Sequence, residues 1–266
     1  RIERRQMRRV RNVFFVGIGG VGMSAIAEVL ITLGYTVSGS DLKPSANTER
    51  LQAKGATVFF GHSAGNVGDA SVVVTSSAID PANPEVLRAR ELGIPVIRRA
   101  EMLAELMRFR FGIAVAGTHG KTTTTSMIGV TLDCAGVSPT IIVGGEVPDL
   151  GTNAKLGTGR YLVSEADESD GSFLKLRPHI AVVTNVEDDH MDHYGTMEKI
   201  IEAFRTFVDQ TDTDGTAVLC FENEILRQIA RETPRRVVSY AIDAEADYRA
   251  ADMETHGSVI SFTAFE

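Results

Sequence analysis

The sequence predicts an α/β protein in which mainly parallel sheets carry helices on both faces. Short apolar runs alternate with segments of helical periodicity, and two glycine-rich loops each follow an apolar run. This cycle begins at residue 12 and restarts at residue 111. With 266 residues, 43% of them hydrophobic, the chain is long enough for two such units. We therefore expect a first domain over residues 1–108 and a second over residues 109–266.

The first unit opens with the apolar run NVFFVGI at residues 12–18, which is typical of a buried parallel strand. Residues 23–33 have helical spacing and end at Gly34, a typical helix stop. Alternating segments of the same kinds follow. We expect strands at residues 35–39, 72–75 and 95–97, and helices at residues 84–92 and 100–107.

The second unit opens with the buried run FGIAVA at residues 111–116, followed by a glycine loop and a helix over residues 123–132. After residue 236 the helical segments stop, and we expect the remaining strands to form a meander. The expected strands are residues 161–164, 180–184, 217–220, 237–240, 246–251 and 259–263, and the expected helices are residues 197–208 and 224–231.

The first glycine loop, GIGGVG at residues 17–22, fits G-x-G-x-x-G and lies between a strand and a helix. Its glycines allow a tight turn and let backbone N–H groups approach a diphosphate at the helix N-terminus. Asp41 ends the next strand, about where a ribose-binding acid lies in Rossmann-like folds. We therefore expect a Rossmann-like first domain. NAD, FAD and a UDP-sugar all suit the loop, and the plain structural alternative is a turn that serves packing alone.

The second glycine loop, GTHGKT at residues 117–122, follows a buried strand and opens a helix. It is a shortened P-loop, because Val115 stands where the usual first glycine would be. Lys121 is expected to reach the β- and γ-phosphates of ATP, and Thr122 to offer its hydroxyl to Mg²⁺. The predicted ATP-binding residues are Gly117, Thr118, His119, Gly120, Lys121, Thr122 and Thr123. Two phosphate loops predict two phosphate-bearing ligands, which a dehydrogenase would not need.

Acidic residues gather after two of the expected strands of the second unit. Carboxyl ends of parallel strands share one edge of a sheet, so these acids are expected near the P-loop. Carboxylates beside a triphosphate repel it unless a cation such as Mg²⁺ is present. For most of them we expect solvated loop positions. The acids are Glu165, Asp167, Glu168, Asp170, Glu187, Asp188, Asp189 and Asp192, with His190 and His193 among them.

Charge and composition exclude several function classes. The net charge of −8 argues against general nucleic-acid binding, and the arginines of residues 1–11 are interpreted as a solvated tail. No apolar run approaches the roughly 20 residues needed to cross a bilayer, and we expect no membrane partner. Cys134 and Cys220 are isolated and fit no zinc spacing, which favours a cytoplasmic location. Nothing indicates an oligomeric state.

The motifs together resemble the Mur ligases, the ATP-dependent amide ligases of peptidoglycan synthesis. The resemblance is carried by GTHGKT at residues 117–122, EADESD at 165–170 and TNVEDDHMD at 184–192. In the first domain it extends to the loop at 17–22, SGSD at 38–41, Gly61 with His62, and TSSAI at 75–79. It covers about residues 13–262.

The resemblance implies roles at the matching positions. Lys121 and Thr122 would hold the phosphates of ATP and Mg²⁺, and Glu165 and His190 would be metal-site residues. Lys121, Glu165 and His190 would therefore form the catalytic set, with Thr122, Glu165 and His190 as the metal set. The UDP-sugar would be held by Gly17, Gly19, Gly20, Gly22, Asp41, His62, Ser76 and Ser77.

Within the family, the chain looks like the member that joins L-alanine to UDP-N-acetylmuramate through an acyl phosphate. The tripeptide-recycling ligase usually has Tyr where Ser169 stands, and other members carry a carbamylated lysine where Phe204 stands. The family has three domains, and the third has no counterpart before Glu266, so a truncated chain that binds UDP-sugar without ligating is expected. An NAD-dependent oxidoreductase and a non-catalytic nucleotide-binding module are the other readings.

Overall fold

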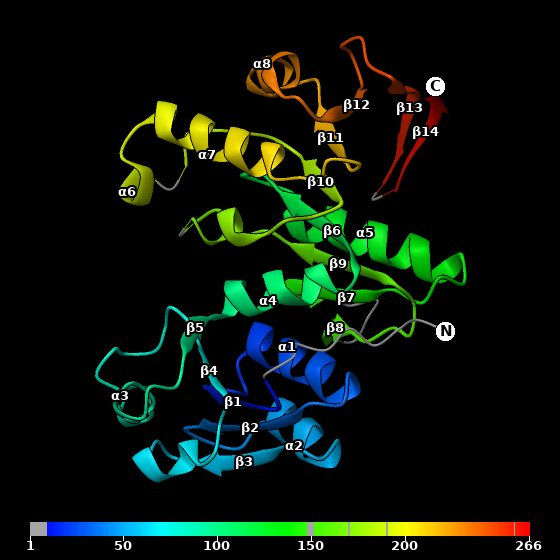
Figure 1. Ribbon diagram of the computed structural model, residues 1–266. Helices are drawn as coiled ribbons and strands as arrows, with labels where there is room; N and C mark the ends of the chain where they lie inside the picture. Colours follow the sequence, from blue (N-terminus) through cyan, green and yellow to red (C-terminus); the bar gives the residue numbers. More distant parts are fainter. Residues whose placement is uncertain (1–9, 148–151, 170, 190, 258) are drawn as a thin grey trace. The chain divides into compact units, whose positions relative to one another are not determined.

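The computed structural model describes residues 10–147, 152–169, 171–189, 191–257 and 259–266 (Figure 1). The arginines before residue 10 therefore lie outside the described residues. Contacts between residues divide the chain into two compact units, one of residues 1–110 with 129–160 and one of residues 111–128 with 161–266. The boundary expected after residue 108 stays a prediction. None of the helices in the described ranges is both long enough and apolar enough to span a bilayer.

The first unit confirms the predicted parallel sheet. Its strands lie in the order β3-β2-β1-β4-β5, and each neighbouring pair is parallel. All five carboxyl ends therefore lie at one edge, where ligands of open α/β sheets bind. The strands are β1 (Asn12–Val16), β2 (Thr36–Asp41), β3 (Thr57–Phe60), β4 (Val72–Thr75) and β5 (Val96–Arg98), and the helices are α1 (Val21–Thr32), α2 (Ala46–Ala53), α3 (Pro84–Glu91), α4 (Arg99–Arg108) and the 3₁₀ turn η1 (Ala64–Val67).

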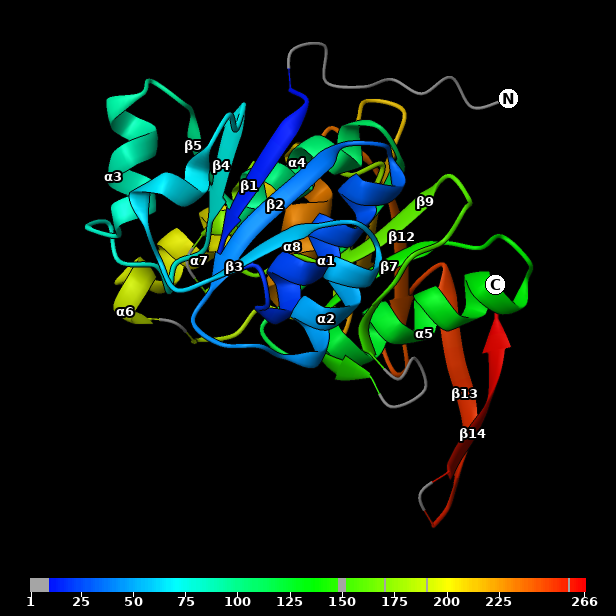
Figure 2. The same cartoon turned by 90° about the horizontal axis from the view of Figure 1, so that it is seen from below.

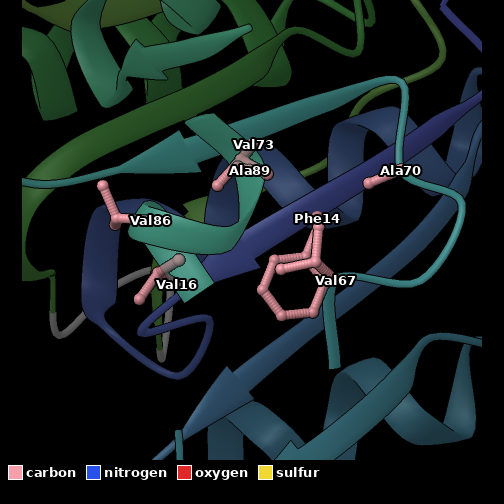
Figure 3. Packing of buried hydrophobic residues seen from close by; sticks show 7 residues of the cluster. All are labelled: Phe14, Val16, Val67, Ala70, Val73, Val86 and Ala89. Carbon is pink, nitrogen blue, oxygen red and sulfur yellow. The ribbon is translucent and has the colours of Figure 1, made fainter. Parts of the chain in front are cut away.

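One hydrophobic cluster of this sheet packs valine and alanine side chains around the ring of Phe14. Phe14 of β1 lies against Val67 of η1, and Val86 and Ala89 of α3 cover the same side of the strands (Figure 3). Asn83 caps α3 by accepting hydrogen bonds from the N–H groups of residues 85 and 86, and Pro84 occupies its first turn. The cap and the apolar stripe fix the helix that delivers Glu85 to the edge of the sheet.

The second sheet has nine strands in the order β14-β13-β12-β11-β10-β6-β9-β7-β8. Its middle strands β9, β6, β10, β11 and β12 are parallel, whereas the pairs β7–β8 and β13–β14 are antiparallel. The strands are β6 (Phe111–Ala116), β7 (Thr140–Val147), β8 (Thr152–Lys155), β9 (Tyr161–Glu165), β10 (Ile180–Val183), β11 (Thr216–Cys220), β12 (Arg236–Ala241), β13 (Tyr248–His256) and β14 (Val259–Phe265). The helices are α5 (Lys121–Cys134), α6 (Met191–Tyr194), α7 (Met197–Asp209), α8 (Glu224–Glu232) and the 3₁₀ turn η3 (Ser172–Lys175).

The expected meander after residue 236 is wrong for its first strand. Strand β12 runs parallel to β11, with Val218 opposite Val238, because helix α8 returns the chain between them. Strand β13 also begins parallel to β12, at the pair Tyr240 and Tyr248. Of the described strands after residue 236, β13 and β14 form an antiparallel hairpin, which extends away from β12 (Figure 2).

Helix α7 shows why Phe204 contributes packing and no ligand. Thr196 caps the helix, and the apolar stripe of α7 buries Phe204 and Phe207. The Phe173 ring of η3 lies 5.3 Å from the ring of Phe204 and 5.2 Å from that of Phe207. Aromatic pairs at such distances stabilise a core beyond the area that they bury. A charged group at position 204 would have to displace this cluster.

Candidate functional site

The first glycine loop leads into the N-terminus of helix α1 at the edge of the five-stranded sheet. The N–H groups of Gly17 and Ile18 donate to Ser40 O over 2.8 and 2.9 Å, and Gly17 has a φ of +77°. Among the described residues no side chain caps α1, and its first turn contains no acidic residue. A helix start with no acidic residue favours an anion through the helix dipole, so the predicted diphosphate role has a physical basis.

Asp41 braces this loop from the end of β2. Its Oδ2 accepts a hydrogen bond from the Gly19 N–H over 2.8 Å, and its Oδ1 accepts one from the Leu42 N–H. A Cβ at Gly19 would lie 2.8 Å from the same Oδ2, so the position has no room for a side chain. Asp41 therefore shapes the loop, and a ribose hydroxyl would have to share or replace the bond to Gly19.

His62 lies in a buried polar network built around Glu85. The fully buried Glu85 carboxylate is 2.9 Å from His62 Nδ1, and its oxygens accept from Ser40 Oγ (2.6 Å) and Asn66 Nδ2 (2.7 Å). The carboxylate thus joins the chain ends that leave β2 and β3 to helix α3. A carboxylate on Nδ1 orients the imidazole and directs its other nitrogen elsewhere. In the sequence, Glu85 is distinguished only by its place in the first turn of an expected helix.

Ser76 and Ser77 follow β4 at the same edge, and Ser77 is exposed. The Ser76 carbonyl accepts from the Arg98 guanidinium over 3.2 Å. Arg99 begins α4, and its guanidinium nitrogen lies 2.6 Å from the point where a Cβ on Gly22 would stand. A cation therefore lies over the first turn of α1. It could not be predicted, because a single arginine after a short strand belongs to no motif.

The segment that follows β10 packs against the P-loop and fixes its conformation. Gly117 has a φ of +138°, and a Cβ there would overlap Thr184 Oγ1. The Thr118 N–H donates to Asn185 O, and the His119 N–H donates to Asn185 Oδ1 over 2.8 Å. The His119 side chain is exposed. The N–H groups of Thr118 and His119 thus already donate to Asn185. A phosphate would therefore bind the N–H groups of Gly120 and of the first turn of α5.

Asn185 is a positioning residue that the sequence analysis did not single out. Its side-chain amide also donates from Nδ2 to the His119 carbonyl over 3.1 Å, so it mimics a backbone pair on both sides of that residue. Thr184 Oγ1 donates to the same carbonyl over 2.6 Å. The signal that could have indicated this role is the pair Thr-Asn directly after a buried strand.

Lys121, Thr122 and Thr123 form the first turn of α5. The threonine side chains are exposed and can meet a ligand. Lys121 instead points back to the loop, with Nζ 2.7 Å from Gly117 O, 3.2 Å from Thr118 O and 2.7 Å from Glu168 Oε1. The lysine thus lies beside the loop that it is expected to serve, and its ammonium is paired with a carboxylate.

The expected solvated position is wrong for Glu168. Its side chain is only 3% exposed and pairs with Lys121, because the turn after β9 folds it inward. Burial raises the pKa of the Glu168 carboxyl, and the bond from Lys121 lowers it in part. The other described acids of the clusters, Asp167, Glu187, Asp188, Asp189 and Asp192, are exposed as expected.

Glu165 fits a cation site. It ends β9 opposite Val115 of β6, the strand that leads into the P-loop. Its Oε1 is buried, and no described residue donates a hydrogen bond to it. A buried carboxylate oxygen without a donor is costly unless a cation binds it. His190 lies outside the described residues. Those that are described contain no cluster of three or more His, Cys, Asp or Glu side chains for a metal, but Mg²⁺ takes few protein ligands when phosphates and water supply the rest.

Comparison with known proteins identifies the family. The family model described as the Mur ligase middle domain matches residues 115–266, and that of the Mur ligase family, catalytic domain, matches residues 12–111. The chain belongs to the Mur ligase family. It is 54% identical over 256 residues to the UDP-N-acetylmuramate–L-alanine ligase of Geobacter sp. (strain M21). That match covers 96% of this chain and 56% of that ligase, so the chain spans little more than half of the relative's length.

Solved structures of Mur ligases share the fold. The UDP-N-acetylmuramate-alanine ligase of Thermotoga maritima superposes with a TM-score of 0.79 at 30% identity, over 95% of this chain and 57% of that one. The UDP-N-acetylmuramate:L-alanyl-γ-D-glutamyl-meso-diaminopimelate ligase of Neisseria meningitides gives 0.82 at 28% identity, over 96% and 84%. These comparisons give no support to the oxidoreductase reading of the first glycine loop.

The Mur ligase membership leaves the individual site residues as proposals. The structure brings the loop at residues 17–22, Asp41, His62, Ser76 and Ser77 to the carboxyl edge of one sheet. It brings the P-loop and Glu165 to the adjoining ends of β6 and β9. Which ligand each group binds stays a prediction.

Proposed function

We propose that the chain provides two ligand sites of an ATP-dependent ligase that joins L-alanine to UDP-N-acetylmuramate in cytoplasmic peptidoglycan precursor synthesis. The observation that carries the proposal is the geometry of the P-loop. The Lys121 ammonium lies against the loop backbone, and Glu165, which has a buried oxygen without a hydrogen-bond donor, ends the neighbouring strand β9. The 54% identity to a ligase with this name over 96% of the chain supports the choice of substrates.

The first unit suits the UDP-sugar. Its glycine loop presents the N-terminus of α1, and Arg99 adds a cation above the first turn. Ser77 and the imidazole of His62 follow β4 and β3 at the same edge and offer hydrogen-bonding groups. A diphosphate at the helix start would leave the uridine and the sugar acid to these edge residues.

The second unit suits ATP. In the proposed reaction the lactyl carboxylate of the sugar acid attacks the γ-phosphorus, ADP leaves, and an acyl phosphate forms. The amine of L-alanine then displaces orthophosphate, loses a proton and forms the amide. Lys121 would offset charge on the transferred phosphoryl group, and the N–H groups at the start of α5 would orient it. Thr122, Glu165 and His190 would hold Mg²⁺, which neutralises phosphate charge.

Two other readings are weighed against this one. The tripeptide-recycling ligase would act on the same sugar acid, and the Neisseria structure shows that its fold is shared. The higher identity of the chain to alanine-adding enzymes and the small side chain of Ser169, which bonds Asp167 over 2.7 Å, favour L-alanine. A non-catalytic nucleotide-binding module would bind the same ligands without releasing orthophosphate.

The test is calorimetric titration of the chain with ADP and Mg²⁺. The wild type should bind, and Lys121→Ala should lose at least about tenfold in affinity, because a charge-assisted contact to phosphate is removed. Lys199→Ala, which changes the same charge on helix α7, should bind as the wild type does. Equal ADP affinity in Lys121→Ala would reject the phosphate role of the loop.

A further inference from the structure

The ammonium of Lys121 already has three acceptors inside the protein. They are the carbonyls of Gly117 and Thr118 and the Oε1 atom of Glu168, at 2.7, 3.2 and 2.7 Å from Nζ. An ammonium group has three donors. A phosphate oxygen can therefore bind it only by displacing one of these acceptors or by sharing a proton with it.

Glu168 is fixed in place by its own backbone. Its carbonyl accepts a hydrogen bond from the Tyr194 hydroxyl over 2.6 Å and another from the Gly171 N–H over 3.0 Å. The Glu168 side chain is 3% exposed, so its charge is poorly screened by solvent. The backbone bonds and the burial thus place the carboxylate against the ammonium of Lys121.

We propose that Glu168 is a positioning residue that holds Lys121 beside the loop and competes with nucleotide phosphates for its ammonium. Of the three acceptors, two are neutral carbonyls of the loop itself, and Glu168 is the charged one. Attraction between a buried carboxylate and an ammonium has to be offset before the lysine serves a phosphate. If Lys121 instead binds Glu168 and the phosphate at the same time, the carboxylate still repels the phosphate. Glu168 then lowers the affinity for nucleotide in this case as well.

The ion pair with Glu168 orders the side chain of Lys121 and lowers the affinity of the loop for nucleotide. A lysine side chain that is held in one conformation loses less rotamer entropy when ligand arrives. The same carboxylate lowers the affinity of the loop for any anion, which favours ligands with several phosphate contacts over single small anions. This inference rests on the proposed nucleotide site and adds a residue that sets its affinity.

The experiment is calorimetric titration of ADP into the chain in EDTA, so that no divalent cation takes part. Glu168→Gln keeps the shape and the acceptor oxygen but removes the charge, and it should bind ADP about tenfold more tightly than the wild type. A residue with a structural role alone would give the opposite sign, because its loss loosens the loop. Unchanged or weaker ADP binding by a folded Glu168→Gln variant overturns the proposal.

Two controls separate this effect from general charge. Asp167→Asn removes the same charge from the same turn, but Asp167 bonds Ser169 and not the lysine, so ADP affinity should stay within about twofold. In a Lys121→Ala background, Glu168→Gln should tighten ADP binding by less than it does beside Lys121, because only the repulsion between carboxylate and phosphate is then relieved and no competition for the ammonium remains. Tightening by the same factor in both backgrounds would contradict the proposal.

A second variant covers failure of the first to fold. Glu168→Asp withdraws the carboxylate by one methylene and should tighten ADP binding in the same direction by about threefold. Weaker binding by a folded Glu168→Asp variant overturns the proposal. If neither the wild type nor any variant binds ADP, the proposed nucleotide site itself is rejected. If the wild type binds ADP and Glu168→Gln binds it no more tightly, only the role of Glu168 is rejected.

Discussion

Gly117 and Thr184 are packed so closely that a Cβ on the glycine would overlap Thr184 Oγ1. The same hydroxyl donates to the His119 carbonyl over 2.6 Å. It therefore excludes a side chain at Gly117 and also fixes the backbone at His119. The loop therefore owes its shape to the strand next to it, and its path depends on that contact.

Gly117→Ala should lower the free energy of unfolding by about 3 kcal/mol, because a φ of +138° is strained for alanine and the methyl group meets Thr184. Urea denaturation would measure it. Gly120→Ala is the matched control, since its φ of +80° lies beside open space, and it should cost only about 1 kcal/mol. Equal costs would show that the contact with Thr184 is unimportant. Adding Thr184→Ala should recover part of the loss in Gly117→Ala.

Glu85→Ala should lower the free energy of unfolding by about 3 kcal/mol or more. The change removes the acceptor shared by Ser40, His62 and Asn66, and it leaves the buried Ser40 hydroxyl and two half-buried groups without it. Glu91→Ala on the same helix breaks only an exposed pair with Arg88 and should cost less than about 0.5 kcal/mol. Chemical denaturation of both variants would measure the difference, and similar costs would contradict the network's importance.

Arg99→Ala should weaken UDP-N-acetylmuramate binding about tenfold, because the guanidinium over the first turn of α1 would no longer meet the diphosphate. Arg108→Ala at the other end of α4 removes an equal charge from an exposed pair with Glu105 and should change affinity less than about twofold. Titration calorimetry would measure both. An unchanged affinity in Arg99→Ala would place the diphosphate away from this turn.

Glu222 should make stability depend on pH. The backbone N–H groups of Asp243, Ile242 and Ala244 hold the pKa of its carboxyl below the usual 4.5. A lowered folded pKa stabilises the fold above the unfolded value, and the contribution is lost as pH falls through the folded pKa. Glu222→Gln should therefore be less stable than the wild type at pH 7, and the gap should close as pH falls below 4.5. Urea midpoints over that range would measure it, and a gap that is constant with pH would contradict the assignment.

The regular elements could be predicted where apolar runs were long and bounded by glycine. Strand β6 coincides with the predicted residues 111–116, and the glycine loops were placed correctly between strand and helix. Helix α2 was missed because it is polar, with only Thr48 and Leu51 buried, and depends on a capping box at Ser45. Strand β3 was missed because a four-residue run that is half-buried has no clear period.

The site was predictable in its motifs and not in its supporting contacts. GTHGKT indicated a phosphate loop, because the strand, the lysine and the helix all fall in one short segment. Glu168 and Asn185 could not be ranked above their neighbours, since burial of one acid among eight depends on how a turn folds. Glu85 and Arg99 come from helices whose placement against the glycine loop is a tertiary property.

The central claim is that the first glycine loop serves a UDP-sugar and not a dinucleotide. Calorimetric titration of the chain with UDP-N-acetylmuramate, beside a matched titration with NADH, tests it most directly. The account predicts saturable binding of the UDP-sugar at one site per chain and none of NADH, with the UDP-sugar affinity unchanged in Lys121→Ala. Binding of NADH without the UDP-sugar would contradict it.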